Sequence, residues 1–108
     1  MSVQVLFISF KFDASPAEYA QAIKPLVNEI LNASGLRWKI WLINEVDCVA
    51  GGIYLFDDAS FAQMFIKSAL MTEWKRRASV SNIHITSFDV IEAETALTHG
   101  PIGKGVRV

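Results

Sequence analysis

Cysteine and histidine are scarce in this chain of 108 residues. Cys48 is the one cysteine, so the chain cannot form an internal disulfide or a metal site built from cysteines alone. With only two histidines besides, a dedicated metal site is not expected. A protein that forms no disulfide suits a reducing compartment, and we expect the cytoplasm.

Charge is also scarce, and it is nearly balanced. Ten Lys and Arg stand against eleven Asp and Glu, which gives a formal net charge of −1. Binding to nucleic acid needs a clear basic excess, so no nucleic-acid partner is expected. No apolar run approaches the roughly 20 residues of a membrane span, and the first residues lack the pattern of a signal peptide. We therefore expect a soluble protein without a membrane partner.

Hydrophobic residues are abundant, at 52% of the chain. Runs rich in β-branched and aromatic residues predict strands at 3–12, 36–46, 50–56 and 82–91. In the second strand one alternating set is apolar and is expected to face the core, and the other is mixed and indicates an edge or an interface. The first set is Leu36, Trp38, Ile40 and Leu42, and the second is Arg37, Lys39, Trp41 and Ile43.

Two helices are expected between these strands. Ser15 and Glu18 form a capping box at the start of the first, which stops before Gly35. Asp58 caps the second, which runs to about Arg77. The resulting order β-α-β-β-α-β predicts an α+β, ferredoxin-like domain with a four-stranded antiparallel sheet and two helices on one face. It is a single domain over 1–108, with a core at about 3–91 and a C-terminal tail at 92–108.

The first strand is apolar on both faces, although the helices can cover only one of them. The free face must be buried against something, and a second copy of the chain is the simplest partner. We therefore expect a homodimer with sheets packed face to face.

Two segments of the chain resemble a known family. Gly35-Leu36-Arg37-Trp38-Lys39-Ile40-Trp41 and Ala50-Gly51-Gly52-Ile53-Tyr54-Leu55-Phe56 are similar to the signature of the YdhR-like monooxygenases, with weaker support from Lys24-Pro25-Leu26 and Phe88-Asp89-Val90. The resemblance covers about 3–91. It implies a dimeric α+β barrel and a cofactor-independent oxygenase-like role, and this role is an analogy at the level of the fold.

Several aromatic residues are candidates for the wall of a substrate cavity: Trp38, Tyr54, Phe65 and Trp74. Trp38 also suits simple core packing, and Tyr54 suits a strand position with its hydroxyl in water. His84 is the candidate catalytic base, since its side chain titrates near neutral pH. The alternative for His84 is a hydrogen-bonded or edge residue without a catalytic role.

These residues support two hypotheses of different class. The first is a cofactor-free monooxygenase acting on a small aromatic or polyketide-like molecule, with no flavin, nicotinamide or metal. The second is a non-catalytic dimer that holds a small apolar ligand. A third, less favoured reading is a haem-degrading type of enzyme, which pairs a Trp and a His at the spacing of Trp74 and His84 but also uses an Asn in the first strand that is missing here.

The tail holds one further pattern, Gly100-x-x-Gly103-Lys104-Gly105. It lacks the hydroxyl residue and the following helix of a phosphate-binding loop, so no nucleotide site is expected.

Overall fold

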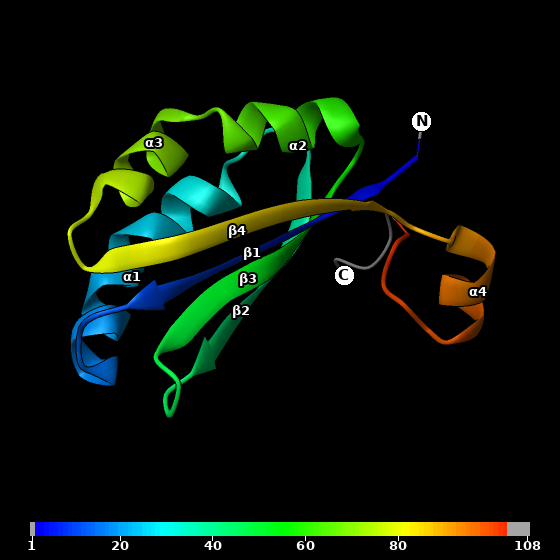
Figure 1. Cartoon of the computed structure of the whole chain (residues 1–108). Coiled ribbons are helices and arrows are strands. Elements are labelled where there is room, and N and C mark those ends of the chain that lie inside the picture. The colour runs from blue at the N-terminus through cyan, green and yellow to red at the C-terminus, as the bar shows by residue number, and fades with distance from the viewer. Residues whose placement is uncertain (1, 104–108) are drawn as a thin grey trace.

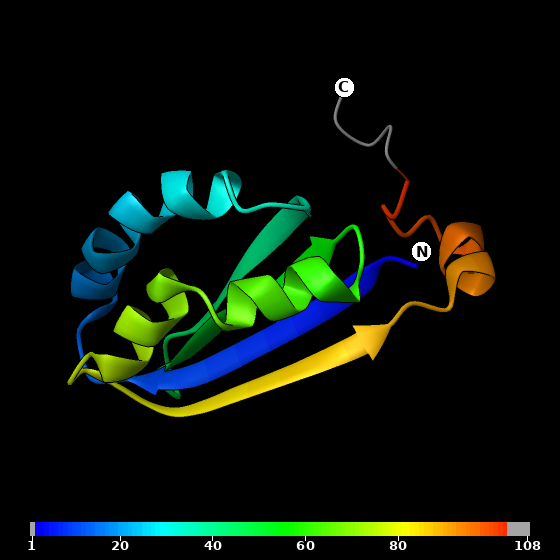
Figure 2. The ribbon, with the colours of Figure 1, turned by 90° about the horizontal axis from the view of Figure 1, so that it is seen from above.

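The computed structural model describes residues 2–103. It confirms the α+β, ferredoxin-like fold, with the sheet order β2-β3-β1-β4 and antiparallel neighbours. The strands are β1 Gln4–Phe12, β2 Leu36–Asn44, β3 Val49–Phe56 and β4 Val80–Asp89. The helices are α1 Pro16–Leu31, α2 Ala59–Ile66, α3 Ala69–Arg76 and α4 Glu92–Leu97. Helices α1, α2 and α3 cover one face of the sheet, and α4 stands apart beyond the end of β4 (Figures 1 and 2).

The expected helix starts are confirmed in their atomic detail. The Ser15 hydroxyl accepts a hydrogen bond from the Glu18 backbone N–H at 3.1 Å, and the Glu18 carboxylate accepts one from the Ser15 N–H at 2.8 Å. Asp58 Oδ1 accepts from the backbone N–H groups of Ser60 and Phe61 at 2.9 and 3.2 Å. These side chains satisfy N–H groups that have no partner within a helix, so each helix begins where the sequence predicts.

The second predicted helix is in fact two helices, which corrects the prediction of one continuous helix to Arg77. Helix α2 ends at Ile66, and Ser68 is the N-cap of α3. The Ser68 hydroxyl donates to the Phe65 carbonyl at 2.7 Å and accepts from the Met71 N–H at 3.3 Å. A serine side chain that bonds to its own backbone competes with the helix. Apolar residues occur at helical spacing on both sides of Ser68, so the sequence pattern does not reveal the break.

A bulge near the start of β2 corrects the predicted faces of this strand. Leu36 pairs with Phe56, but the next residue of β3, Leu55, pairs with Trp38. The extra residue moves every later side chain to the other face of the sheet. Lys39 and Trp41 therefore point toward the helices. The other alternating set, which is Trp38, Ile40 and Leu42, points to the face that no helix covers.

The described part of the tail contains a helix, whereas the sequence predicts no element there. Helix α4 occupies its first part, and the segment after it returns to the sheet. The Trp38 indole Nε1 donates to the Pro101 carbonyl at 2.8 Å, and the Arg37 guanidinium donates to the Ile102 carbonyl. Lys104 and Gly105 of the glycine-rich pattern lie outside the described residues. Within residues 2–103, none of the helices has the length and apolar character needed to cross a membrane.

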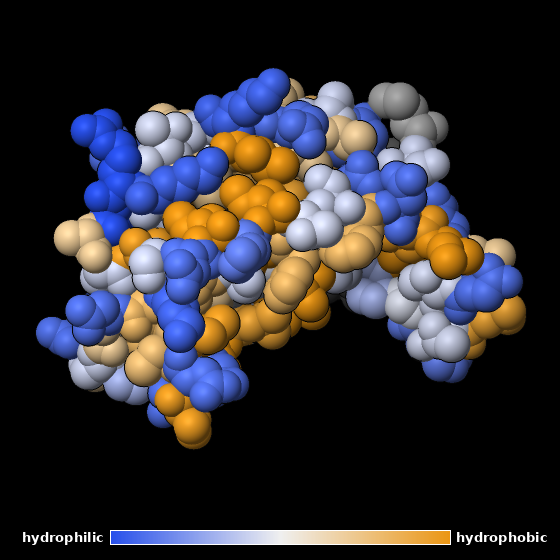
Figure 3. Space-filling model, in the orientation of Figure 1, coloured by the Kyte–Doolittle hydropathy of each residue, from blue (hydrophilic) through white to orange (hydrophobic). Residues whose placement is uncertain are grey.

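The core lies between the sheet and helices α1, α2 and α3. It is built on the alternate residues of β1 that face the helices, namely Leu6, Ile8, Phe10 and Phe12. The opposite face remains apolar and open. Its exposed side chains are Phe7, Ile40, Leu42 and Phe88, with 37–50% of their surface accessible. Hydrophobic surface also shows as a broad band across the middle of the molecule in Figure 3.

The open sheet face leads to a prediction about assembly. We expect a homodimer of about twice the 12.0 kDa chain mass, because an exposed apolar sheet face is stabilised by burial against a partner. Phe7 lies on β1, near the middle of this face, so Phe7→Lys should shift the protein to monomer in light scattering. Met64→Lys, at an exposed position of α2, is the matched control and should remain dimeric. A wild-type monomer at micromolar concentration would contradict the prediction.

Candidate active site

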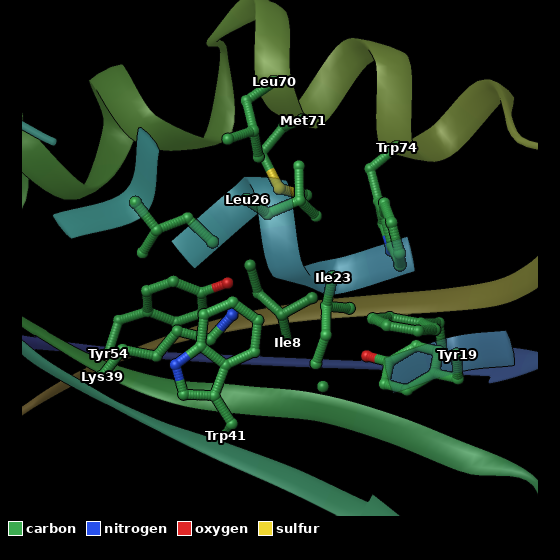
Figure 4. A pocket seen from close by; sticks show the side chains of 13 residues that line it. Ile8, Tyr19, Ile23, Leu26, Lys39, Trp41, Tyr54, Leu70, Met71 and Trp74 are labelled. Carbon is green, nitrogen blue, oxygen red and sulfur yellow. The ribbon is translucent and has the colours of Figure 1, made fainter. Parts of the chain in front are cut away.

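A small cavity lies between the sheet and helices α1 and α3 (Figure 4). Its walls come from β1, β2, β3, α1 and α3, so it needs the whole fold to form. Lys39, Trp41 and Tyr54 lie at one end of the view, and Tyr19 and Trp74 lie at the other. The volume is about 20 Å³, which is room for about one water molecule.

Lys39 is the charged residue in this apolar wall. Its Nζ lies 3.4 Å from the ring centroid of Trp41 and 4.6 Å from that of Tyr54. The aliphatic part of the side chain crosses Gly52 on the neighbouring strand. A Cβ atom at Gly52 would lie 2.5 Å from the Lys39 Cε, so the missing side chain at Gly52 is what gives Lys39 its path.

Burial governs the electrostatics of the cavity. Loss of hydration lowers the pKa of Lys39 to about 7, because burial disfavours the charged ammonium. The same effect raises the pKa of Tyr19 to about 12. It also raises the pKa of Tyr54, with a smaller contribution from the charge of Tyr19. No Asp or Glu lines the cavity in the described part of the chain. At neutral pH the cavity thus holds two neutral hydroxyls and an amine that can release or take up a proton.

Trp74 adds an unused hydrogen-bond donor. Its Nε1 is buried and has no hydrogen-bond partner, although most buried polar groups have one. The ring is held by edge contacts with Phe10 and Tyr19, at centroid distances of 5.4 and 6.3 Å. A ligand oxygen in the cavity would satisfy this N–H group.

Trp41 separates the cavity from a larger groove of about 260 Å³ between α1 and β2. Tyr19 and Ile23 are also shared by the two spaces. A dry cavity of about 150 Å³ accepts a benzene ring, so the inner cavity alone is too small for an aromatic ligand. An aromatic ligand would therefore have to occupy part of this groove as well.

The structure places only some of the residues that the sequence suggests for a site in the cavity wall. Tyr54 and Trp74 line the cavity, and Phe65 packs behind Tyr54 at a centroid distance of 4.9 Å without lining it. Trp38 lies on the other face of the sheet and bonds to the tail. Their roles in substrate binding stay predictions.

His84 is also on the other face. It pairs with Ser9 of β1, its side chain is exposed, and it does not line the cavity. Strand alternation turns this side chain away from the helices and from the cavity, and the role of His84 as a catalytic base stays a prediction. For the same reason the structure does not bring His84 and Trp74 together as the haem-degrading reading requires.

Sequence reasoning missed Lys39 as a cavity residue, and it placed Trp41 on the mixed face of its strand. Strict alternation along β2 assigns them to the outer face, and the bulge that reverses the assignment has no clear mark in the sequence. Gly52 is a partial signal, since a glycine within a strand often marks the close approach of another group. Among residues 2–103, no cluster of three or more His, Cys, Asp or Glu side chains is placed to hold a metal ion.

The buried amine leads to a prediction about stability and pH. Lys39 loses its proton near pH 7 in the folded protein, but at its ordinary pKa of 10.5 when unfolded. Between these values the unfolded chain binds more protons, so the free energy of unfolding should rise with pH from about 7 to about 10. Above pH 10 the sign reverses, because Tyr19 and Tyr54 ionise more readily when unfolded.

Urea denaturation at pH 6.5 and 9.5 measures this effect. The wild-type midpoint should lie at a higher urea concentration at pH 9.5. The free energy of unfolding should rise by at most about 3 kcal/mol, and by less where water reaches the amine. Lys39→Met has no amine to titrate and should show a smaller rise. An equal rise in both proteins would contradict the prediction.

Structural comparison shows what the fold is similar to. A protein of unknown function from Nitrosomonas europaea matches with a TM-score of 0.70 and 16% identity, over 84% of this chain and 91% of that one. A protein from Shewanella oneidensis matches with a TM-score of 0.68 and 11% identity, over 82% and 91%. A mutant of SnoaB from Streptomyces nogalater, described as a cofactor-independent oxygenase, matches with a TM-score of 0.68 and 12% identity, over 85% and 96%. At these identities the likeness shows the fold alone.

Sequence comparison is more specific. Among curated proteins no relative is found. The model of the family described as "Putative mono-oxygenase ydhR" matches residues 5–101, which include every strand except the first residue of β1 and every residue of the cavity wall. This match confirms the resemblance seen in the segments around Trp38 and Tyr54. The chain belongs to the YdhR mono-oxygenase family.

Proposed function

We propose that this protein is a cofactor-independent monooxygenase that oxidises a small aromatic or polyketide-like molecule in the cavity between the sheet and helices α1 and α3. The observation that carries the proposal is a small, aromatic-walled cavity whose Trp74 N–H group has no partner among the described residues. Membership of a mono-oxygenase family supports the reaction type. The description of SnoaB as a cofactor-independent oxygenase supports the absence of a cofactor by analogy of fold.

The reaction needs a substrate that can reduce oxygen itself. Loss of a proton from an activated carbon or hydroxyl gives an anion, which passes an electron to O₂. For an anthrone-like methylene group the net change is one carbonyl oxygen gained, two hydrogens lost and one water released. The protein supplies a dry site, a proton acceptor and donors for the developing charge.

The residues of the cavity suit these tasks. The aromatic rings of Trp41 and Tyr54 form part of the wall and offer apolar contact to a planar substrate. The hydroxyls of Tyr19 and Tyr54 keep their protons at neutral pH, because burial raises the pKa of both groups. They and the Trp74 N–H group can therefore donate to substrate oxygens.

Oxygen consumption with a panel of hydroquinones and anthrones tests the proposal. Uptake of O₂, with ¹⁸O from labelled O₂ found in the product, is the expected result. Ile23→Trp fills the passage between cavity and groove and should lower turnover at least about 10-fold, as expected when substrate positioning is lost. Val27→Trp makes the same change one turn further along α1, outside the cavity, and should retain the wild-type rate.

Ligand binding without oxygen uptake across the panel would contradict the proposal and favour the non-catalytic binding protein. Circular dichroism of both tryptophan variants shows whether each is folded, so that a loss of turnover reports on the cavity.

A further inference from the structure

We propose that the cavity binds its ligand as an anion, with the proton of a weakly acidic aromatic hydroxyl transferred to Nζ of Lys39, and that Lys39 is the catalytic base of the oxygenation. The catalytic part of this inference rests on the proposed function, whereas the binding part does not.

The position of the amine is defined by the fold. The side chain runs across Gly52 and ends between the rings of Trp41 and Tyr54, with Nζ 3.4 and 4.6 Å from their centroids. Ring faces stabilise an ammonium group once it forms. Lys39 can therefore hold either protonation state at one place in the cavity wall.

The amine has no counter-ion in the described part of the chain. The described residues form two ion pairs, Arg37 with Asp57 and Glu73 with Arg76. Neither pair involves Lys39. An unpaired ammonium in an apolar wall is costly, and an anion close to it offsets that cost. A ligand that delivers both the proton and the negative charge would complete the pair.

The proton balance of the step is simple. The ligand O–H bond breaks, the proton goes to the Nζ lone pair, and the electron pair stays on the ligand oxygen. Burial lowers the pKa of Lys39 to about 7, so a substantial share of the amine is neutral and able to accept a proton near neutral pH. The other titratable groups that line the cavity, Tyr19 and Tyr54, remain neutral and can donate hydrogen bonds to the anion.

These properties favour a particular class of ligand. A carboxylic acid is already ionised and strongly hydrated before it enters, so it has no proton to give at neutral pH. A simple phenol, with a pKa near that of tyrosine at about 10, holds its proton too firmly for ready transfer. A phenol made more acidic by a conjugated carbonyl or nitro group lies between them, and its flat ring suits the aromatic walls.

The test uses 4-nitrophenol, whose anion is yellow and whose neutral form is nearly colourless. Its nitro group withdraws electrons, so its phenolate is a poor reductant of O₂. Titration with wild-type protein, one pH unit below the solution pKa of the probe, should give the phenolate absorbance, with the apparent pKa of the bound probe lowered by at least about one unit. This follows from an ion pair that favours the charged form. Lys39→Met should abolish that shift. Lys67→Met, at an exposed position after α2, should leave it unchanged.

A second pair of variants tests position rather than charge. Gly52→Ala keeps the amine but introduces a Cβ within 2.5 Å of the Lys39 Cε, so it should reduce the shift. Gly103→Ala adds the same methyl group where no atom lies within 4 Å and should behave as wild type. An unchanged shift in Lys39→Met, or no phenolate absorbance with wild type at millimolar probe, would overturn the inference.

The outcomes separate this inference from the proposed function. A Lys39-dependent phenolate signal without oxygen uptake supports anion binding and rejects the oxygenase. On an oxidised substrate, Lys39→Met should lower turnover by about 10²–10⁴-fold, the usual contribution of a general base. Full turnover in Lys39→Met, with loss in His84→Ala instead, would reject Lys39 as the base while the oxygenase stands.

Discussion

The bulge near the start of β2 is the constraint on which the cavity depends. Side chains alternate along a strand, so one extra residue after Leu36 reverses the face of all that follow. Without it, Lys39 and Trp41 would lie on the open face of the sheet and Trp38 would enter the helix-covered core. With it, an amine and an indole ring meet Tyr54 beneath α1 and α3. The chemistry proposed for this protein therefore follows from a local departure from strand regularity.

A half-buried lysine without a carboxylate partner among the described residues lowers stability, and an apolar residue of similar length would fit the same wall. The fold accommodates Lys39 with particular features: a glycine at position 52 in its path and two ring faces around its amine. These features hold the nitrogen in place but leave its charge unpaired. Such an arrangement is typical of a functional group, because perturbed titration in a cavity is common where proton transfer occurs. Trp74 adds a second unsatisfied polar group, its buried N–H, to the wall of the same cavity.

The two faces of the sheet have different roles. The helix-covered face holds the cavity, and the open face carries exposed apolar residues together with His84 and Trp38. Part of this side is already covered by the chain itself, since Trp38 and Arg37 bond to the carbonyls of Pro101 and Ile102. Arg37 also pairs with Asp57 at 2.6 Å, which ties the tail to β2 and to the end of β3. His84, the base that the sequence suggests, thus lies on the open face of the sheet, whereas Lys39 lines the cavity.

The sequence by itself determined the order of the strands, the fold class and the family. Strand composition, the capping box of Ser15 and Glu18 and the cap at Asp58 are local signals, since each depends on residues a few positions apart. It also indicated Tyr54 and Trp74, because large aromatics on a strand and a helix that face each other must share an interior. Only the tertiary structure decided that Ser68 breaks the second helix, that β2 bulges, and that Lys39 crosses Gly52. The break at Ser68 is local, but the bulge and the path of Lys39 come from pairing and packing between distant segments. The pKa of Lys39 changes for the same reason, as it depends on the helices and strands that remove its water.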